Sequence, residues 1–571
     1  MNFQSLPTDS KSILALQWAD YEPYYADLEK RNLSVDNIDE WLNDWSTLAQ
    51  TADEQYWRLY IATTVNTAEP AIEEAFNTYI EELQPSIKTA EQKLKDKILA
   101  SGLSPKSFWT ALRMIQAEAD IFAQENLPLL AEEQKLATEY NKVTGSLTVM
   151  WDNKEIPLSQ MHPLFYETDR STRQRAWETV FACTIKERKN INDVWEKFVP
   201  LRLKIAENAG MPDYRAYMWK QKFRFDYSPE DCKSFHAAIE QVVVPAAKRV
   251  YERRRQRLGI DSLRPWDLLV DPHGKTPIKA SESDEEFKAR ALSIFKHVDP
   301  VLGGYFQTMI DEGLLDIESR KNKAPGAYSL GLHVAHRPFI FMSNNNTPWD
   351  VQTILHEGGH AFHEFERAHC HFYQRGEYYL PAEFAEVASM GMELLASPYK
   401  TKEYGGFYTD SEAARAMVEL LETSITFWPY MALVDAFQHW IYENPSDGSV
   451  ASKCEEKWAE LWDRFMSGID YSGLEDAKKT YWHRQLHIFQ SPFYYVEYGL
   501  AQLGAVQVWA NSRKDHKKAV AEYRKALALG ATVPLPELFS TAGAKFAFDA
   551  KTLKTAVDLM EEVIEEMQAK L

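Results

Sequence analysis

Two histidines and a glutamate at close spacing are the residues of this chain best suited to carry out chemistry. His356, Glu357 and His360 form an H-E-x-x-H pattern. On a helix, residues i and i+4 project from the same face one turn apart, so both imidazoles can reach a single metal ion. The glutamate between them is close enough to take a proton from an activated water without occupying a ligand position. The pattern predicts a metal-dependent hydrolase.

The residues around this pattern predict the helix that the chemistry requires. Thr347 is a suitable N-cap, Pro348 falls at the first helical position, and Asp350 can complete a capping box. Inside the helix, Gly358 and Gly359 each cost about 1 kcal/mol relative to alanine. We therefore expect a close neighbour at these glycines, either another helix or a bound peptide.

A short apolar strand is predicted just before this helix, from Pro338 to Met342. As an edge strand it could pair with an extended peptide through its backbone, which makes Phe339, Ile340 and Phe341 candidate substrate contacts. The two glycines of the helix would then leave room for that peptide beside the metal. As an ordinary core strand it would not contact substrate, and the sequence alone leaves both interpretations open.

A catalytic zinc site needs a third protein ligand and an open position for water. The candidates downstream are His363, Glu364, Glu366, His369, His371, Glu377, Glu383, Glu386 and Glu393. His363 lies about two turns from His356, so we expect it to support the site or pack beside it without binding the ion. Glu383, Glu386 and Glu393 share one side of a second helix that is predicted to start near Pro381. Spacing alone does not choose between Glu383 and Glu386.

Two blocks of sequence resemble the thimet oligopeptidase/oligoendopeptidase F family of zinc peptidases. The first runs from His356 to Glu366 and continues in Glu383-Phe384-Ala385-Glu386-Val387-Ala388-Ser389. The second comprises His483, His487, the segment from Pro492 to Gly499, and Ala501-Gln502-Leu503-Gly504. The likeness covers roughly residue 140 to the end and is strongest from 323 to 504. Gly358 favours the oligoendopeptidase F-like branch.

The resemblance implies a role for several of these residues. Glu386 would be the third zinc ligand, and Glu383 would orient a ligand histidine. His487 and Tyr498, with Tyr494 or Tyr495, would line the cleft opposite the zinc and donate hydrogen bonds to the oxygen that becomes negative during amide hydrolysis. The loop Gly326-Ala327-Tyr328 and the strand at Pro338 also match the family and would bind substrate.

The same resemblance implies a mainly α fold, with two lobes around a deep substrate channel and a small β element next to the zinc helix. One Zn²⁺ per chain, held by His356, His360 and Glu386, would assist the hydrolysis of oligopeptides, with Glu357 as general base. One rival is a dipeptidyl carboxypeptidase or other exopeptidase, which would need a dedicated charge for the free terminus of its substrate. A zinc-stabilised peptide-binding protein without catalysis is disfavoured, because Glu357, His487 and Tyr498 are all present.

Outside these blocks the sequence is mostly helical in pattern. Residues 1–140 are predicted to form a helical region that walls the channel, and 141–571 the catalytic region. Leu147 to Trp151, the turn Asp152-Asn153-Lys154, and Glu155 to Leu158 predict a β-hairpin.

Composition narrows the class of protein further. The net charge of −20 argues against binding to nucleic acid or to anionic membranes. The four cysteines are widely spaced, without a C-x-x-C pair, so reduced thiols are expected. The first twenty residues lack a continuous apolar segment, and we expect no signal peptide and a cytoplasmic location.

Overall fold

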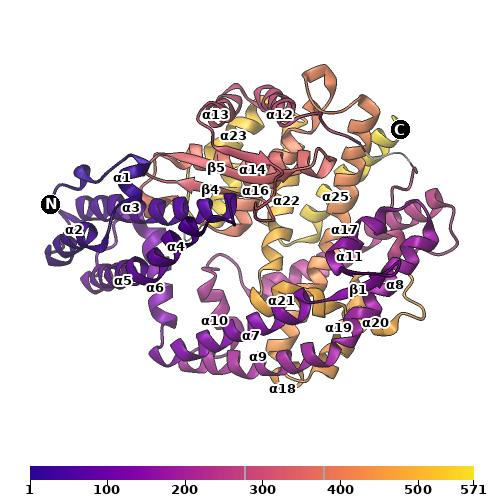
Figure 1. Cartoon of the computed structure of the whole chain (residues 1–571), viewed down its shortest axis with the longest axis horizontal. Coiled ribbons are helices and arrows are strands. Elements are labelled where there is room, and N and C mark those ends of the chain that lie inside the picture. The colour runs from indigo at the N-terminus through magenta and orange to yellow at the C-terminus, as the bar shows by residue number, and fades with distance from the viewer. Residues whose placement is uncertain (275–277, 377–379) are drawn as a thin grey trace.

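The computed structural model describes residues 1–274, 278–376 and 380–571. The protein is built mainly from helices, as predicted, with one two-stranded and one three-stranded sheet in the described part of the chain (Figure 1). Glu377, a candidate ligand on sequence grounds, lies outside the described residues. None of the helices in the described ranges is both long and apolar enough to cross a membrane.

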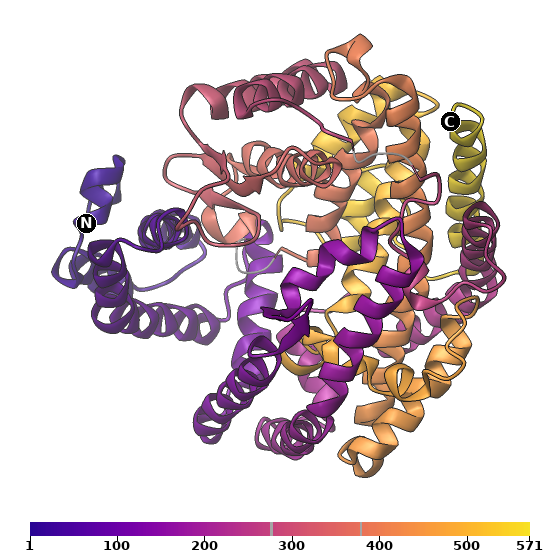
Figure 2. The same ribbon diagram turned by 45° about the vertical axis from the view of Figure 1, so that its right-hand side comes forward.

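The N-terminal helices lie at one end of the molecule and have a hydrophobic core of their own (Figures 1 and 2). They are α1 (Ser10–Leu14), α2 (Trp18–Lys30), α3 (Ile38–Val65), α4 (Pro70–Thr78), α5 (Gln84–Ser101) and α6 (Trp109–Ile121), with a π-helical turn at Tyr79–Leu83. This core includes Tyr373 from the catalytic part of the chain, whose hydroxyl donates to the half-buried Glu91 at 2.5 Å. The predicted boundary at residue 140 stays a prediction.

The next part of the chain contains the predicted hairpin. The strands β1 (Thr148–Trp151) and β2 (Lys154–Pro157) pair antiparallel. Asp152 and Asn153 both have positive φ, of 47° and 65°, which suits a tight hairpin turn that follows the twist of the strands. The hairpin prediction is confirmed. The helices of this part of the chain are α7 (Leu127–Gly145), α8 (Arg170–Lys186), α9 (Arg188–Asn208), α10 (Tyr214–Gln221), α11 (Pro229–Leu258), α12 (Asp284–Val298) and α13 (Pro300–Asp311).

The three-stranded sheet has the order β3-β5-β4, with bounds Leu315–Glu318, Arg337–Asn344 and Tyr328–Leu332 respectively. Strand β5 therefore lies in the middle, parallel to β3 and antiparallel to β4. The interpretation of β5 as an edge strand is wrong, because both of its hydrogen-bonding edges are occupied. Ile340 and Phe341 are completely buried and belong to the core, so their side chains do not reach a substrate.

The C-terminal half supplies the helices that carry the site. They are α14 (Pro348–Arg367), α15 (Phe372–Arg375), α16 (Ala382–Leu395), α17 (Asp410–Glu443), α18 (Pro445–Gly448), α19 (Ala451–Phe465), α20 (Glu475–Lys479), α21 (Leu486–Gln490), α22 (Tyr495–Ser512), α23 (His516–Leu527), α24 (Leu535–Thr541) and α25 (Ala550–Gln568). Helix α14 packs between β5 and α16, and α16 packs against α22. Short 3₁₀ turns connect the helices at Phe3–Ser5, Lys106–Phe108, Gln124–Asn126, Leu158–Tyr166, Pro265–Asp267, Ser397–Tyr399, Lys402–Tyr404 and Tyr481–Arg484.

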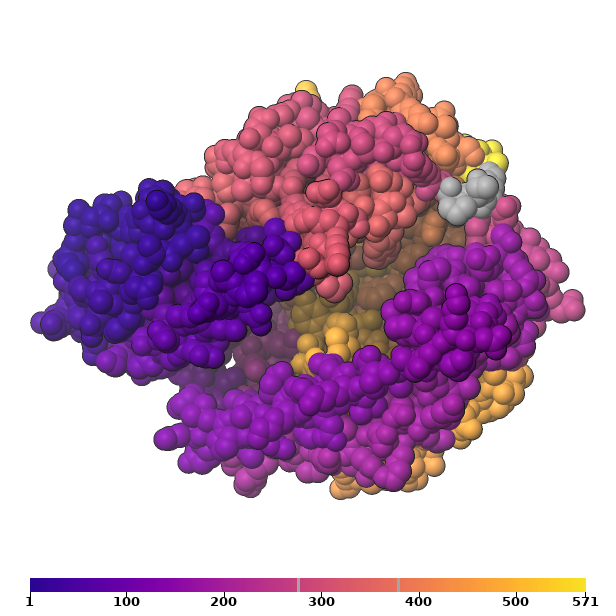
Figure 3. All heavy atoms as spheres, in the orientation of Figure 1, coloured from indigo at the N-terminus to yellow at the C-terminus, as the bar shows by residue number. Residues whose placement is uncertain are grey.

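A deep hollow opens in the face shown in Figure 3. The N-terminal helices and the region of β4, β5 and α14 bound it on one side, and the segment around α7 to α9 bounds it on the other. Atoms from the C-terminal part of the chain form its floor. Two lobes around a channel are the arrangement that the family resemblance implied.

Candidate metal centre and active site

Helix α14 begins as the sequence predicts. The Thr347 side chain accepts from the backbone of Asp350, and Asp350 Oδ2 accepts from the backbone N–H of Thr347 at 2.8 Å. This reciprocal capping box satisfies N–H groups that would otherwise be unpaired at the helix start. The confirmed helix start places His356, Glu357 and His360 in the middle of α14, where the two histidines lie near Glu386 of α16.

Three side chains from α14 and α16 form a group with the geometry of a metal site. Ligand atoms of His356, His360 and Glu386 all lie within 4.8 Å of one another. Glu386 Oε2 is 3.4 Å from His356 Nε2 and 3.8 Å from His360 Nε2. Bonds of about 2.0–2.1 Å in a tetrahedral zinc site put neighbouring donor atoms about 3.3 Å apart. Two imidazoles and a carboxylate at these separations fit a zinc ion with only a small contraction.

The two glycines of α14 allow the helices to approach each other closely. A Cβ on Gly359 would lie 2.4 Å from the backbone oxygen of Ala388 and 2.6 Å from the Cα of Ser389, both on α16. A Cβ on Gly358 would lie 2.6 Å from the buried ring of Phe295. The glycines are therefore explained by a neighbouring helix and ring. The alternative, that they leave room for a bound peptide, is wrong.

Glu393 is the carboxylate that orients a candidate ligand histidine. His356 Nδ1 lies 2.6 Å from Glu393 Oε1, which leaves Nε2 directed at Glu386. The sequence-based assignment of this role to Glu383 is wrong, because Glu383 accepts from the Tyr227 hydroxyl at 2.5 Å and bonds no histidine among the described residues. The spacing of seven residues between Glu386 and Glu393 indicates that both lie on one face of the helix. It does not indicate that Glu393 bonds His356 while Glu386 faces both histidines.

Burial controls the protonation of the groups around the candidate metal position. Burial, together with the charge of Glu386, raises the pKa of Glu357 to about 7. Burial also raises the pKa of Glu386. Burial and the nearby His356 lower the pKa of His360 to about 3, which keeps that imidazole neutral as a metal ligand must be. A buried carboxyl with a raised pKa beside a candidate metal group is typical of a functional residue.

The second sequence block forms an aromatic cluster at the start of α22. The ring of Tyr498 lies 5.1 Å from that of Tyr494 and 6.0 Å from that of Tyr495, and the His487 ring packs 4.8 Å from Tyr495. Burial and the negative charge of Glu386 raise the pKa of Tyr498 to about 12, and the same two causes contribute to the raised pKa of Tyr494. Both phenols therefore stay protonated and lie within the electrostatic reach of the candidate metal group.

The hydrogen bonds of His487 determine which of its nitrogens carries the proton. The Gln485 amide nitrogen lies 2.8 Å from His487 Nδ1, and Gln485 Oε1 accepts from the Tyr430 hydroxyl at 2.9 Å. Because an amide nitrogen only donates, Nδ1 must accept, and the proton of the neutral ring sits on Nε2. Burial and the positive charge of Lys222 lower the pKa of His487. His487 is therefore a neutral Nε2–H donor.

Arg224 holds the tyrosine segment in place, a role that the sequence did not reveal. Its guanidinium donates to the backbone oxygen of Phe493 and to Glu497 Oε1, the latter at 2.6 Å. Phe493 has a φ of +63°, an unusual conformation that this contact and a bond from its N–H to Gln438 help to fix. Arg224 follows α10 in the chain, far from α22 in sequence, and no local pattern marks the pairing.

The remaining predicted site residues lie at the edge of the sheet or in the core. Gly326 and Ala327 are exposed, and Tyr328 begins β4, where its ring stacks on Phe341 at 4.8 Å and its hydroxyl is 2.6 Å from that of Thr64. Phe339 is partly buried on the central strand. His363 is buried and packs edge-on against Phe384, in agreement with the expected packing role.

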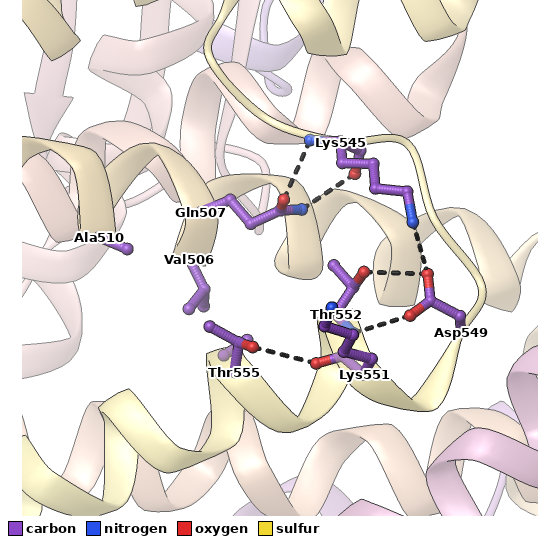
Figure 4. A pocket seen from close by; sticks show the side chains of 9 residues that line it. Val506, Gln507, Ala510, Lys545, Asp549, Lys551, Thr552 and Thr555 are labelled. Atoms are coloured by element: carbon purple, nitrogen blue, oxygen red, sulfur yellow. Dashed lines mark hydrogen bonds and ion pairs between the residues drawn. The ribbon is translucent and has the colours of Figure 1, made fainter.

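The pocket shown in Figure 4 lies away from this site, between α22 and α25. Its polar groups are bonded to one another: Lys545 Nζ donates to Asp549 at 2.8 Å, and Gln507 bonds the backbone of Lys545. These contacts connect α22 to the start of α25. The polar groups that line the pocket are used in them and do not converge on a ligand position.

A helix with two histidines and a glutamate, faced by a second helix with a carboxylate, is the arrangement typical of H-E-x-x-H metallohydrolases. The profile of peptidase family M3 matches residues 164–557, and the chain belongs to this family. It is 21% identical over 494 residues to an oligoendopeptidase F homolog of Borreliella burgdorferi, covering 83% of this chain and 78% of the relative. An oligoendopeptidase F homolog of Lactococcus lactis subsp. lactis is 25% identical over 335 residues, covering 57% of this chain and 52% of that relative.

Among solved structures, that of Pz peptidase A with an inhibitor superposes with a TM-score of 0.82 at 25% identity, over 99% of both chains. The protein is thus an oligoendopeptidase F-like peptidase of family M3, and its likeness in fold to a solved peptidase spans 99% of the chain.

Proposed function

We propose that this protein is a zinc-dependent endopeptidase that hydrolyses internal peptide bonds of oligopeptides. The observation that carries the proposal is the grouping of His356, His360 and Glu386 beside Glu357, at distances that fit one ion. The names of the relatives support oligopeptides as the substrates. The hollow between the lobes fits an extended chain better than a folded protein. The proposed location is cytoplasmic, in keeping with four cysteines that form no disulfide.

The two histidines and Glu386 would hold the ion, and Glu393 would keep His356 in the tautomer that binds through Nε2. When bound, zinc supplies a Lewis acid that polarises the substrate carbonyl and makes water a better nucleophile. Glu357 takes a proton from the attacking water and passes it to the leaving amine. Burial raises the pKa of Glu357, which favours its taking a proton from the attacking water.

His487 and the tyrosines of α22 would stabilise the negative charge that develops on the carbonyl oxygen. His487 donates through Nε2, and the protonated phenol of Tyr498, with Tyr494 or Tyr495, is a second donor. Such prearranged donors act most strongly in a site from which water is excluded. The catalytic roles of these residues are part of the proposal.

The exopeptidase alternative needs a cation free to bind a substrate carboxylate. The cations beside the tyrosine cluster are already engaged: Arg224 bonds Glu497 at 2.6 Å, and Lys222 Nζ lies 3.4 Å from the same carboxylate. This pairing favours endopeptidase activity. Sequencing the products of a peptide ladder by mass spectrometry distinguishes the two activities. An exopeptidase would cut every peptide at a fixed short distance from one end, whatever the length of the peptide.

The general-base assignment is tested with Glu357→Gln, which keeps the size and polarity of the side chain. We expect the zinc content to be unchanged and kcat to fall by about 10²–10⁴-fold. The zinc content is measured by atomic emission and the hydrolysis with a quenched fluorescent peptide. Activity within a few-fold of the unaltered enzyme would refute the role of Glu357.

A further inference from the structure

A second group of metal-binding side chain types lies in the core between α11 and α17. Cys232 and His236 stand one turn apart on α11, and Asp435 and His439 stand one turn apart on α17. Residues at i and i+4 share a helix face, and here the two faces meet, because α11 and α17 pack side by side (Figure 1). Ligand atoms of Cys232, Asp435 and His439 lie within 4.8 Å of one another, and all three residues are buried.

Two atoms in this group have hydrogen-bonding capacity that the surrounding protein does not use. Asp435 Oδ1 is buried and has no hydrogen-bond partner in the described part of the chain. The Cys232 thiol makes no hydrogen bond there either, whereas the other three cysteines each donate to a backbone oxygen, of Thr148, Ala528 and Gly448. Buried carboxylate oxygens are nearly always satisfied, so an orphaned one calls for a ligand.

An ion pair between Asp435 and the histidines explains only part of this arrangement. Asp435 Oδ2 lies 2.7 Å from His236 Nε2 and 3.4 Å from His439 Nε2. These contacts use one carboxylate oxygen and leave Oδ1 and the thiol of Cys232 without a role. A cation placed among the three side chains would engage all of them.

We propose that Cys232, Asp435 and His439 bind a second divalent ion of the zinc class. His236 would stay outside the ligand set and hold the Asp435 carboxylate in place through its 2.7 Å contact with Oδ2. Binding releases the thiol proton of Cys232, and the resulting thiolate and carboxylate neutralise the two positive charges of the ion, as a dry interior requires. A thiolate and an imidazole together select zinc-like ions over magnesium or calcium.

Loading the site requires one local change. An Arg215 N–H now lies 3.4 Å from His439 Nδ1, where it donates. When His439 Nε2 binds the ion, Nδ1 carries the proton, so Arg215 gives up this long contact and keeps its ion pair with Glu443 at 2.5 Å.

The proposed ion would brace the helix behind the tyrosine segment. The His439 ring packs 5.3 Å from the ring of Phe493, and the neighbouring Gln438 accepts from the Phe493 N–H at 3.0 Å. An ion that joins α11 to α17 would therefore fix the support of the segment that leads into α22. The role is structural and does not depend on the proposed peptidase mechanism.

Cobalt(II) distinguishes the two metal groups, because only the second contains sulfur. The metal-depleted full-length protein is reloaded with cobalt chloride, and the near-ultraviolet absorption band from thiolate-to-cobalt charge transfer is titrated. We expect the band to saturate by two equivalents, because the group of His356, His360 and Glu386 also binds cobalt but contributes no thiolate band. It should persist in His360→Ala, which removes a ligand of the other group, and disappear in Cys232→Ser.

Cys454→Ser is the matched control, since Cys454 is equally buried but bonds the backbone of Gly448. This variant should keep the band, and Asp435→Asn should weaken cobalt binding by tenfold or more. Absence of the band in the unaltered protein, or its survival in Cys232→Ser, would overturn the proposal. The cobalt titration of the unaltered protein needs no variant, so its result does not depend on whether a substitution impairs folding.

Discussion

Replacing Gly359 by alanine tests whether close packing of α14 on α16 builds the metal group. The added Cβ would lie 2.4 Å from the backbone oxygen of Ala388, which is 1.0 Å short of the 3.4 Å at which ordinary contacts begin. The contact atoms are backbone, so no side chain can rotate away, and the two helices must separate by roughly 1 Å. Metal sites tolerate changes of only about 0.2 Å in ligand distance.

This separation moves Glu386 away from the two histidines. We expect Gly359→Ala to weaken zinc binding by about 10–100-fold, similar to the loss of an orienting partner, and to reduce kcat/KM accordingly at limiting zinc. Overpacking costs about 1–3 kcal/mol, against a gain of about 1 kcal/mol in helix propensity, so the melting temperature should fall as well.

Gly391→Ala is the control, because it makes the same exchange on α16. Its Cβ would meet only the Tyr523 ring, at 3.4 Å, so we expect normal zinc binding and a slightly raised melting temperature. Zinc affinity is measured by competition with a chromogenic chelator, and stability by thermal unfolding. If Gly359→Ala binds zinc and hydrolyses peptide as well as Gly391→Ala does, the packing argument fails.

Three further predictions concern the proposed mechanism. Because Glu357 acts as a carboxylate, kcat/KM should fall as the pH decreases. The midpoint should lie between the ordinary pKa of 4.5 and the raised pKa of about 7, since a bound cation lowers the pKa below the raised value. A flat profile down to pH 4.5 would contradict this. Glu393→Gln should weaken zinc binding by about 10–100-fold. Glu383→Gln should affect zinc binding less, and equal losses would disprove the separate roles. Tyr498→Phe should lower kcat by about 10²–10³-fold with little change in KM, if the phenol donates only in the transition state.

The local features of the site could be predicted from sequence because their causes are local. The capping box of Thr347 and Asp350 and the i, i+4 spacing of His356 and His360 depend on residues within one or two turns. The hairpin likewise follows from two turn residues that accept positive φ. The choice of Glu386 as the third ligand needed the family resemblance, because Glu383 lies on the same side of the helix.

The features that the sequence interpretation missed all depend on a partner from elsewhere in the chain. Strand β5 is central because β3, from an upstream segment, occupies its second edge, and nothing within β5 specifies this. Gly359 is explained by the backbone of α16, and Glu393 is distinguished from Glu383 only by which of them meets His356. Such pairings are decided by packing over long sequence separations.

The same long-range packing joins the two halves of the proposed mechanism into one rigid unit. Glu383, one turn before Glu386, accepts from Tyr227, and the nearby Arg224 bonds Glu497, one residue before Tyr498. Burial and the charge of Glu497 raise the pKa of Glu383, so the two carboxylates interact across α16 and α22. Loss of Arg224 would remove the closer of the two cations beside Glu497 and leave only the longer contact with Lys222. The spacing between the metal ligand and the phenol donor therefore depends on a residue that contacts neither of them.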